Sequence, residues 1–152
     1  MRRILSLILV LGMSVPVISA QDVDALLAAM TRREKIAQII IVAIDSGESP
    51  AARAEHERLV REGLGGIIVM DDGLAPCMQA VNDLQAQARI PLLVSIDGEW
   101  GASMRFYEYA FFPRAMQLGA LDDEALLEQT GRAIGEELRE IKISRITLRS
   151  WT

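Results

Sequence analysis

Three unbroken apolar runs divide the chain after residue 38. They cover residues 39–44, 67–70 and 91–97, and the last run ends in Ser-Ile-Asp. The run at 39–44 is β-branched and has no polar position, which is typical of a strand buried on both faces of a parallel sheet. We therefore expect three parallel strands, the first of them covered on both faces.

Helical periodicity fills the segments between these runs. Thr31 with Glu34 forms a capping box, and Ser49 with Pro50 supplies an N-cap and a first-turn proline. Helices are expected at residues 23–30, in a short turn from 31, and at 50–62, 76–88 and 122–141. This alternation predicts an α/β protein, and periodicity leaves open whether it is a barrel or a doubly wound sheet.

The first twenty residues have the pattern of a secretory signal peptide. Arg2 and Arg3 precede an apolar stretch that ends in the small residues Ser19 and Ala20. The alternative is a membrane anchor, but polar residues, glycine and proline interrupt a stretch shorter than the about 20 apolar residues of a span. We expect cleavage after Ala20, export to the periplasm or the extracellular space, and no stable membrane span afterwards.

Composition narrows the classes of partner. The chain is 51% hydrophobic and 24% charged, which is ordinary for a globular protein. Its formal net charge of -5 is spread along the sequence without a basic stripe, which argues against nucleic acid as a partner. Cys77 is the only cysteine, so neither an intramolecular disulfide nor a cysteine-based zinc site is available. We expect no metal and no cofactor.

The segment after the third apolar run contains the candidate binding residues Asp97, Glu99, Trp100 and Arg105. In parallel α/β folds, ligands bind beyond the carboxyl ends of the strands. Carboxylates accept hydrogen bonds from sugar hydroxyls, a guanidinium donates several, and an indole offers an apolar face. A purely structural interpretation is equally open, in which Asp97 caps a turn, Arg105 pairs with a nearby acid and Trp100 packs over the rim.

An ordered set of motifs runs through the chain. The motifs are Thr-x-x-Glu-Lys-Ile-x-Gln at 31–38, Gly-Leu-Gly-Gly-Ile-Ile at 63–68, Pro-Leu-Leu-Val-Ser-Ile-Asp at 91–97, Asp-x-Glu-x-Gly with a later arginine at 97–105, Phe-Pro-x-x-Met-x-Leu-Gly-Ala at 112–120 and Gly-x-x-x-Gly-x-Glu-Leu-Arg at 131–139. In this order they resemble the N-terminal domain of glycoside hydrolase family 3, most of all the bacterial β-N-acetylhexosaminidases. The resemblance spans residues 24–141.

The resemblance implies a fold and an activity. The fold is a (β/α)₈ TIM barrel, of which this chain would carry about the first three strand-helix units. The activity is retaining hydrolysis of a β-linked N-acetylhexosaminide, a carbohydrate substrate. Asp97 and Arg105 match the family's sugar-binding positions, with Glu99 and Trp100 as further candidates, although many relatives have glycine at position 100. The family's catalytic groups lie downstream, so we expect no catalytic residue in this chain and no turnover.

Residues 142–152 depart from the family pattern, which continues with a strand containing Asn-Phe-Ala-Pro. Read two bases later with permissive codons, residues 145–152 spell His-Asn-Phe-Ala, two aliphatic residues and Asp. We hypothesise a reading-frame shift near Ile141, which divides the chain into a signal peptide (1–20), a partial barrel (21–141) and a non-matching tail (142–152). Gene sequencing tests this, and an unbroken frame with unrelated downstream codons would contradict it.

Two other functions stay open. The first is a non-catalytic, exported sugar-binding fragment. It would bind N-acetylglucosamine, and changing Asp97 to Asn would abolish that binding. A doubly wound binding protein of another class would use residues 63–66 as a phosphate loop, but these glycines precede a strand, whereas a phosphate loop follows one. His56, the only histidine, is interpreted as a solvated surface residue.

Overall fold

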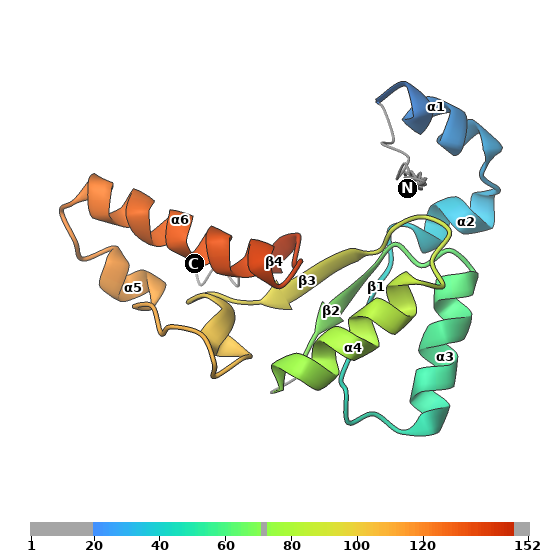
Figure 1. Ribbon diagram of the computed structural model, residues 1–152. Helices are drawn as coiled ribbons and strands as arrows, with labels where there is room; N and C mark the ends of the chain where they lie inside the picture. Colours follow the sequence, from blue (N-terminus) through green and yellow to red (C-terminus); the bar gives the residue numbers. More distant parts are fainter. Residues whose placement is uncertain (1–19, 71–72, 148–152) are drawn as a thin grey trace, which may run out of the picture. The chain divides into compact units, whose positions relative to one another are not determined.

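The computed structural model describes residues 20–70 and 73–147 (Figure 1). The predicted signal peptide, apart from its last residue, and residues 148–152 of the tail lie outside the described residues. The chain divides into two units, residues 1–30 and 31–152. Helix α1 (Ala20–Ala29) of the first unit agrees with the helix predicted there. Among the described helices, none combines the length and the apolar character needed to cross a membrane.

A parallel sheet forms the centre of the second unit. Its strands lie in the order β1 (Ile41–Ile44), β2 (Gly66–Val69), β3 (Leu93–Asp97) and β4 (Arg145–Thr147). Each strand pairs with its sequence neighbour in the parallel sense. The α/β class and the partial-barrel architecture predicted from the sequence are therefore confirmed.

Strand β4 is the main difference from the predicted elements, because the sequence indicated three strands and the sheet has four. This strand falls in the segment predicted to be a non-matching tail. It has only three residues, Arg-Ile-Thr, too few for a hydrophobic period to be recognised. Ser144 fixes its position, since its backbone N–H and its hydroxyl both donate to the Val94 carbonyl at 3.0 Å.

Helices α2 and α3 begin directly after the predicted capping residues, whereas α4 begins two residues before its predicted start, α6 begins two residues after it, and α5 and the 3₁₀ turn were not predicted. They are α2 (Arg32–Ala37), α3 (Pro50–Arg61), α4 (Leu74–Gln85), the short α5 (Ala115–Leu118), α6 (Glu124–Glu140) and a 3₁₀ turn, η1 (Ala102–Met104). The Thr31 hydroxyl accepts from the Glu34 N–H while the Glu34 carboxylate accepts from the Thr31 N–H, which completes the capping box. At α3 the Ser49 hydroxyl accepts from the Ala52 N–H, and at α6 the Asp123 carboxylate accepts from the Leu126 N–H, each as a single cap.

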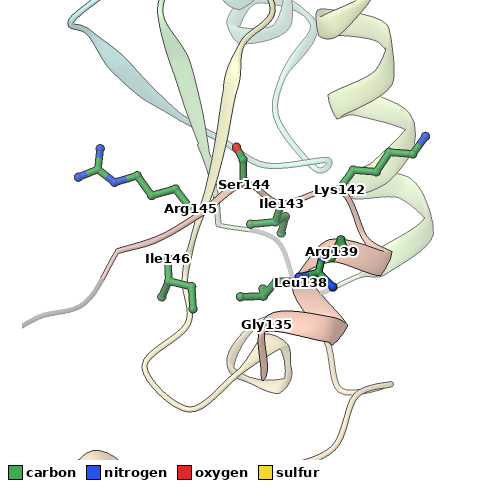
Figure 2. Close-up of a pocket in the computed structure, with 8 residues that line it drawn as sticks. All are labelled: Gly135, Leu138, Arg139, Lys142, Ile143, Ser144, Arg145 and Ile146. Atoms are coloured by element: carbon green, nitrogen blue, oxygen red, sulfur yellow. The ribbon is translucent and has the colours of Figure 1, made fainter. Parts of the chain in front are cut away.

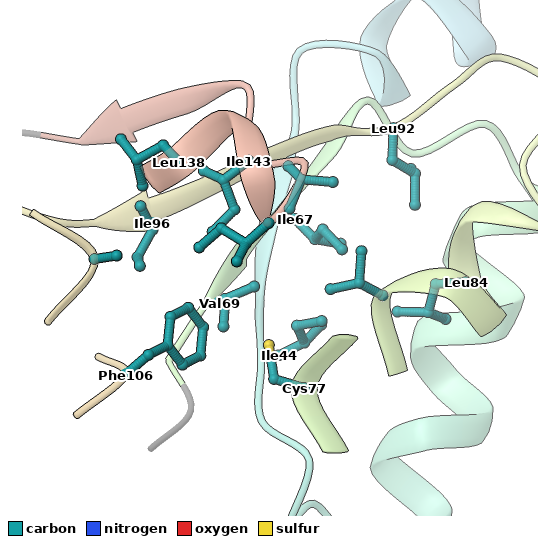
Figure 3. Packing of buried hydrophobic residues seen from close by; sticks show 14 of the residues in the cluster. Ile44, Ile67, Val69, Cys77, Leu84, Leu92, Ile96, Phe106, Leu138 and Ile143 are labelled. Atoms are coloured by element: carbon teal, nitrogen blue, oxygen red, sulfur yellow. The ribbon is translucent and has the colours of Figure 1, made fainter. Parts of the chain in front are cut away.

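The hydrophobic core lies between one face of the sheet and the helices (Figure 3). Because side chains alternate along a strand, every second residue of each strand enters it. The sheet contributes Ile44, Ile67, Val69, Val94 and Ile96, and the other elements contribute Val60, Cys77, Val81, Leu84, Phe106, Leu138, Ile141 and Ile143. Cys77 is a buried core residue, as expected.

Among the described residues of the second unit, no helix covers the opposite face of the sheet at β1. We call it the open face, and by register and alternation it consists of Ile41, Ala43, Gly66, Ile68, Leu93, Ser95, Asp97, Arg145 and Thr147. Ile41 is 40% exposed and Leu93 37% exposed. The prediction that both faces would be covered is therefore wrong for β1, where an apolar sequence reflects a tendency to be buried but supplies no covering element.

Candidate functional site

Asp97 and Arg105 come together beyond the carboxyl end of β3. Asp97 is the last residue of the strand, and Arg105 follows the 3₁₀ turn η1. The Arg105 Nη2 donates to Asp97 Oδ2 at 3.1 Å, and both side chains are partly buried. The turn thus folds the chain back so that two residues eight positions apart form an ion pair at the edge where ligands bind in parallel α/β folds.

The ion pair leaves two polar atoms without partners. Asp97 Oδ1 and Arg105 Nε are buried and form no hydrogen bond within the described part of the chain. A buried polar group without a partner costs about 1–3 kcal/mol, so such atoms favour a ligand or a water molecule that satisfies them. The pair therefore has one acceptor atom and one donor atom whose hydrogen-bonding capacity is unused among the described residues.

Close packing at Gly101 determines the shape of the loop. Gly101 has φ +90, and its N–H donates to the Gly98 carbonyl at 3.1 Å. A Cβ at this position would lie 2.8 Å from Cδ2 of Phe112. Only glycine adopts this conformation under the Phe112 ring without strain, so the loop has one well-defined path between Asp97 and Arg105.

Trp100, a further candidate sugar contact, already has a partner. The Arg114 guanidinium lies 4.7 Å from the centroid of its ring, in cation–π geometry. A sugar that stacks on Trp100 must therefore use the opposite face of the indole or displace Arg114. Glu99 is half-buried in the same loop.

The sequence did not predict that three residues support this loop: Phe112 and Glu137, which belong to quoted motifs, and Arg114, which was not named. Helix α6 brings Glu137 close enough that its Oε2 would lie 3.5 Å from a Cβ at Gly101. That oxygen is buried and has no hydrogen-bond partner among the described residues. Glu137 does belong to the Gly-x-Glu-Leu-Arg motif, which is the one signal that points to it.

A group of carboxylates lies near the end of the loop. Burial raises the pKa of Tyr109, and the negative charges of Glu140, Glu137 and Glu108 raise it further. The phenol therefore stays protonated at neutral pH, and it can donate a hydrogen bond.

The structure corrects the interpretation of His56 as a solvated residue. Its side chain is only 16% exposed, and its Nδ1 lies 2.8 Å from Oε2 of Glu48 in the segment between β1 and α3. The sequence did not predict this contact, because Glu48 lies before the helix that carries His56 and helical spacing does not relate the two residues. Across residues 20–70 and 73–147, no three histidine, cysteine or acidic side chains are grouped to hold a metal ion.

Comparison with known proteins agrees with the fold and the motifs. The family model described as "Glycosyl hydrolase family 3 N terminal domain" matches residues 31–147, which includes β4. No curated protein matches the chain. A solved structure, "Beta-glucoside phosphorylase BglX bound to 2FGlc", superimposes with a TM-score of 0.68 at 20% sequence identity, over 81% of this chain. The chain spans 22% of that protein's length. The chain belongs to glycosyl hydrolase family 3, as an N-terminal domain sequence.

Proposed function

We propose that this chain is the sugar-binding, N-terminal part of an exported β-N-acetylhexosaminidase and that it has no turnover by itself. The observation that carries the proposal is the Asp97–Arg105 ion pair at the carboxyl end of β3, in which Asp97 Oδ1 and Arg105 Nε are buried and form no hydrogen bond among the described residues. The motif set favours the N-acetylhexosaminidase type. The solved relative is named as a β-glucoside phosphorylase, so the identity of the sugar is part of the proposal.

A sugar satisfies both unpartnered atoms at once. Each hydroxyl donates one hydrogen bond and accepts others. One hydroxyl can therefore donate to Asp97 Oδ1 while its neighbour on the ring accepts from Arg105 Nε. The existing bond between the two side chains holds them in place before the ligand arrives, which lowers the entropic cost of binding.

The absence of turnover follows from the chemistry of retaining glycosidases. They need a nucleophilic carboxylate and an acid/base group about 5–5.5 Å apart across the scissile bond. The family resemblance assigns both groups to positions downstream of the segment that it covers. Asp97 and Arg105 are therefore proposed to hold the sugar, and we assign neither the nucleophile nor the acid/base role to them.

Changing Asp97 to Asn is expected to weaken binding of N-acetylglucosamine at least tenfold. The substitution removes the charge that holds Arg105 and replaces a charged acceptor, a loss of about 1.5–3 kcal/mol. Titration calorimetry on the purified chain measures the affinity. Asp83→Asn is the matched control, because Asp83 pairs with Arg53 between α3 and α4, away from the loop.

Two results would contradict the binding proposal. One is N-acetylglucosamine binding that Asp97→Asn and Asp83→Asn leave equally unchanged, and the other is no binding by the unsubstituted chain. Glucose is titrated in parallel. Equal affinity for glucose and N-acetylglucosamine would contradict the N-acetylhexosaminidase type while leaving the sugar site intact.

Purified residues 21–152 are expected to release no product from a chromogenic N-acetylglucosaminide above the rate without protein. A complete β-N-acetylhexosaminidase serves as the positive control for the assay. Hydrolysis that a single substitution within residues 21–152 abolishes would show that the catalytic groups are inside this chain.

A further inference from the structure

The cavity beside β4 and the loop after β3 differ in what they offer a polar ligand. The cavity has a volume of about 520 Å³ (Figure 2). Its apolar lining includes Leu138, Ile143 and Ile146. Figure 2 shows Lys142 and Arg145 pointing away from each other, so these two cations do not converge on one point. The polar atoms that lack partners lie instead around the loop.

Polar atoms at and next to the loop after β3 are buried without partners. We call residues 98–105 the β3 loop. Asp97 Oδ1 and Arg105 Nε at its ends, and Glu137 Oε2 next to Gly101, form no hydrogen bond among the described residues. Each atom has lost water without gaining a partner, which disfavours this conformation. A ligand contacts an atom only where that atom is accessible, so a sugar reaches Asp97 Oδ1 and Arg105 Nε only if the chain around them moves.

Residues 112–114 contact the middle of the β3 loop at two points. Phe112 packs on Gly101, where an added Cβ would lie 2.8 Å from the ring, and the Arg114 guanidinium lies 4.7 Å from the centroid of the Trp100 ring. The first contact is close-packed. The second depends on an exposed arginine, and cation–π contacts at exposed sites are weak. The Arg114 stack is therefore the contact that breaks more easily.

We propose that the stack of Arg114 on Trp100 is a latch that keeps the β3 loop closed, and that sugar binds to an open form in which this stack is broken. The latch favours the closed form and the sugar favours the open form, so each weakens the other. Gly98 and Gly101 are the hinge positions, because glycine adopts backbone conformations that other residues rarely reach. The inference rests on the proposed sugar site, to which it assigns a control of access.

Hydrogen exchange of the full chain without sugar tests the latch by itself. The Gly101 amide donates to the Gly98 carbonyl at 3.1 Å, so it exchanges when the loop opens. Arg114→Gln removes the cation and is expected to speed this exchange about two- to fivefold. The Leu93 amide, which donates to the Gly65 carbonyl in the sheet, is expected to keep its rate.

Titration calorimetry with N-acetylglucosamine tests whether the latch opposes binding. Arg114→Gln is expected to tighten binding about two- to fivefold, because the open form becomes more populated. Arg114→Lys keeps a cation at the ring, so its affinity is expected to lie closer to that of the unsubstituted chain. Arg132→Gln is the matched control, because it removes an arginine that pairs with Glu128 on the exposed surface of α6.

Trp100→Leu removes the other half of the stack. In a chain that carries Trp100→Leu, the Arg114→Gln change is expected to alter neither the exchange of the Gly101 amide nor the sugar affinity, since the two residues act through one contact. Circular dichroism confirms that each variant is folded.

Three outcomes would overturn the latch. These are Gly101 exchange that Arg114→Gln leaves unchanged, sugar binding that depends on Asp97 but that Arg114→Gln weakens or leaves unchanged, and equal effects of Arg114→Gln with and without Trp100. Failure of the proposed sugar site has a different signature. In that case N-acetylglucosamine binding is absent or does not respond to Asp97→Asn, while the exchange of the Gly101 amide still responds to Arg114→Gln.

Discussion

Gly65→Ala is expected to prevent stable folding of the sheet-bearing unit. An added Cβ would lie 1.9 Å from the Gln38 carbonyl oxygen and 2.5 Å from its carbon, both backbone atoms that cannot rotate away. Moving the Gly65 segment away from Gln38 would break hydrogen bonds, because the Gly65 N–H donates to the Ala37 carbonyl and the Gly65 carbonyl accepts from the Leu93 N–H. We expect a loss of more than about 3 kcal/mol, a large fraction of the about 5–15 kcal/mol that stabilises a typical domain.

Urea denaturation followed by circular dichroism measures this effect, with Gly131→Ala as the matched control. Apart from the backbone of its own helix and its chain neighbours, no atom lies within 4 Å of a Cβ at Gly131, which is in the interior of α6. The same substitution there should stabilise the chain by about 0.5–1 kcal/mol, because alanine is the better helix former. Equal unfolding midpoints for the two variants would contradict the close approach between Gly65 and Gln38.

Phe106→Ala is expected to cost about 3–5 kcal/mol of unfolding free energy. The Phe106 ring is 0% exposed and lies in the core, so its removal leaves a cavity beneath the loop. The ring and Ala102, the first residue of the turn that precedes Arg105, belong to the same buried cluster, so removal of the ring loosens the packing under that turn. Sugar affinity should therefore fall together with stability.

Phe111→Ala is the matched control for Phe106→Ala. It also removes a phenyl ring, but Phe111 is 68% exposed in the same loop, so the comparison isolates the effect of burial. Its unfolding free energy should stay within about 0.5 kcal/mol of the unsubstituted chain. Thermal or urea unfolding of the two variants gives the comparison. A Phe106→Ala chain as stable as Phe111→Ala would mean that the core does not extend under the loop.

The parts of the fold that the sequence predicted depend on local signals. Apolar runs located β1, β2 and β3, and Ser49 with Pro50 gave the start of α3, because capping acts within one helical turn. Strand β4 was not predicted, because three residues are too few to show a repeating hydrophobic pattern. What covers each face of the sheet was also beyond the sequence, as the 40% exposed Ile41 of β1 shows.

For the candidate site, too, the sequence predicted what depends on local signals and not the contacts between distant residues. Asp97 and Arg105 were predicted because they lie eight positions apart in one loop and match a family motif. The contacts of Gly101 with Phe112 and of Trp100 with Arg114 were not, since each joins residues more than ten positions apart. His56 was misinterpreted because composition shows that a helix is polar but does not show which polar residue finds a partner.

The stacking of Arg114 on Trp100 gives the loop an intrinsic optical reporter. Indole emission depends on the charges next to the ring, and the cation lies 4.7 Å from its centroid. The sequence contains one other tryptophan, Trp151, so replacing Trp151 with phenylalanine leaves a single fluorophore two residues before the Ala102–Met104 turn. Any event that moves the guanidinium would then change the emission spectrum of unlabelled protein, in real time and at micromolar concentration.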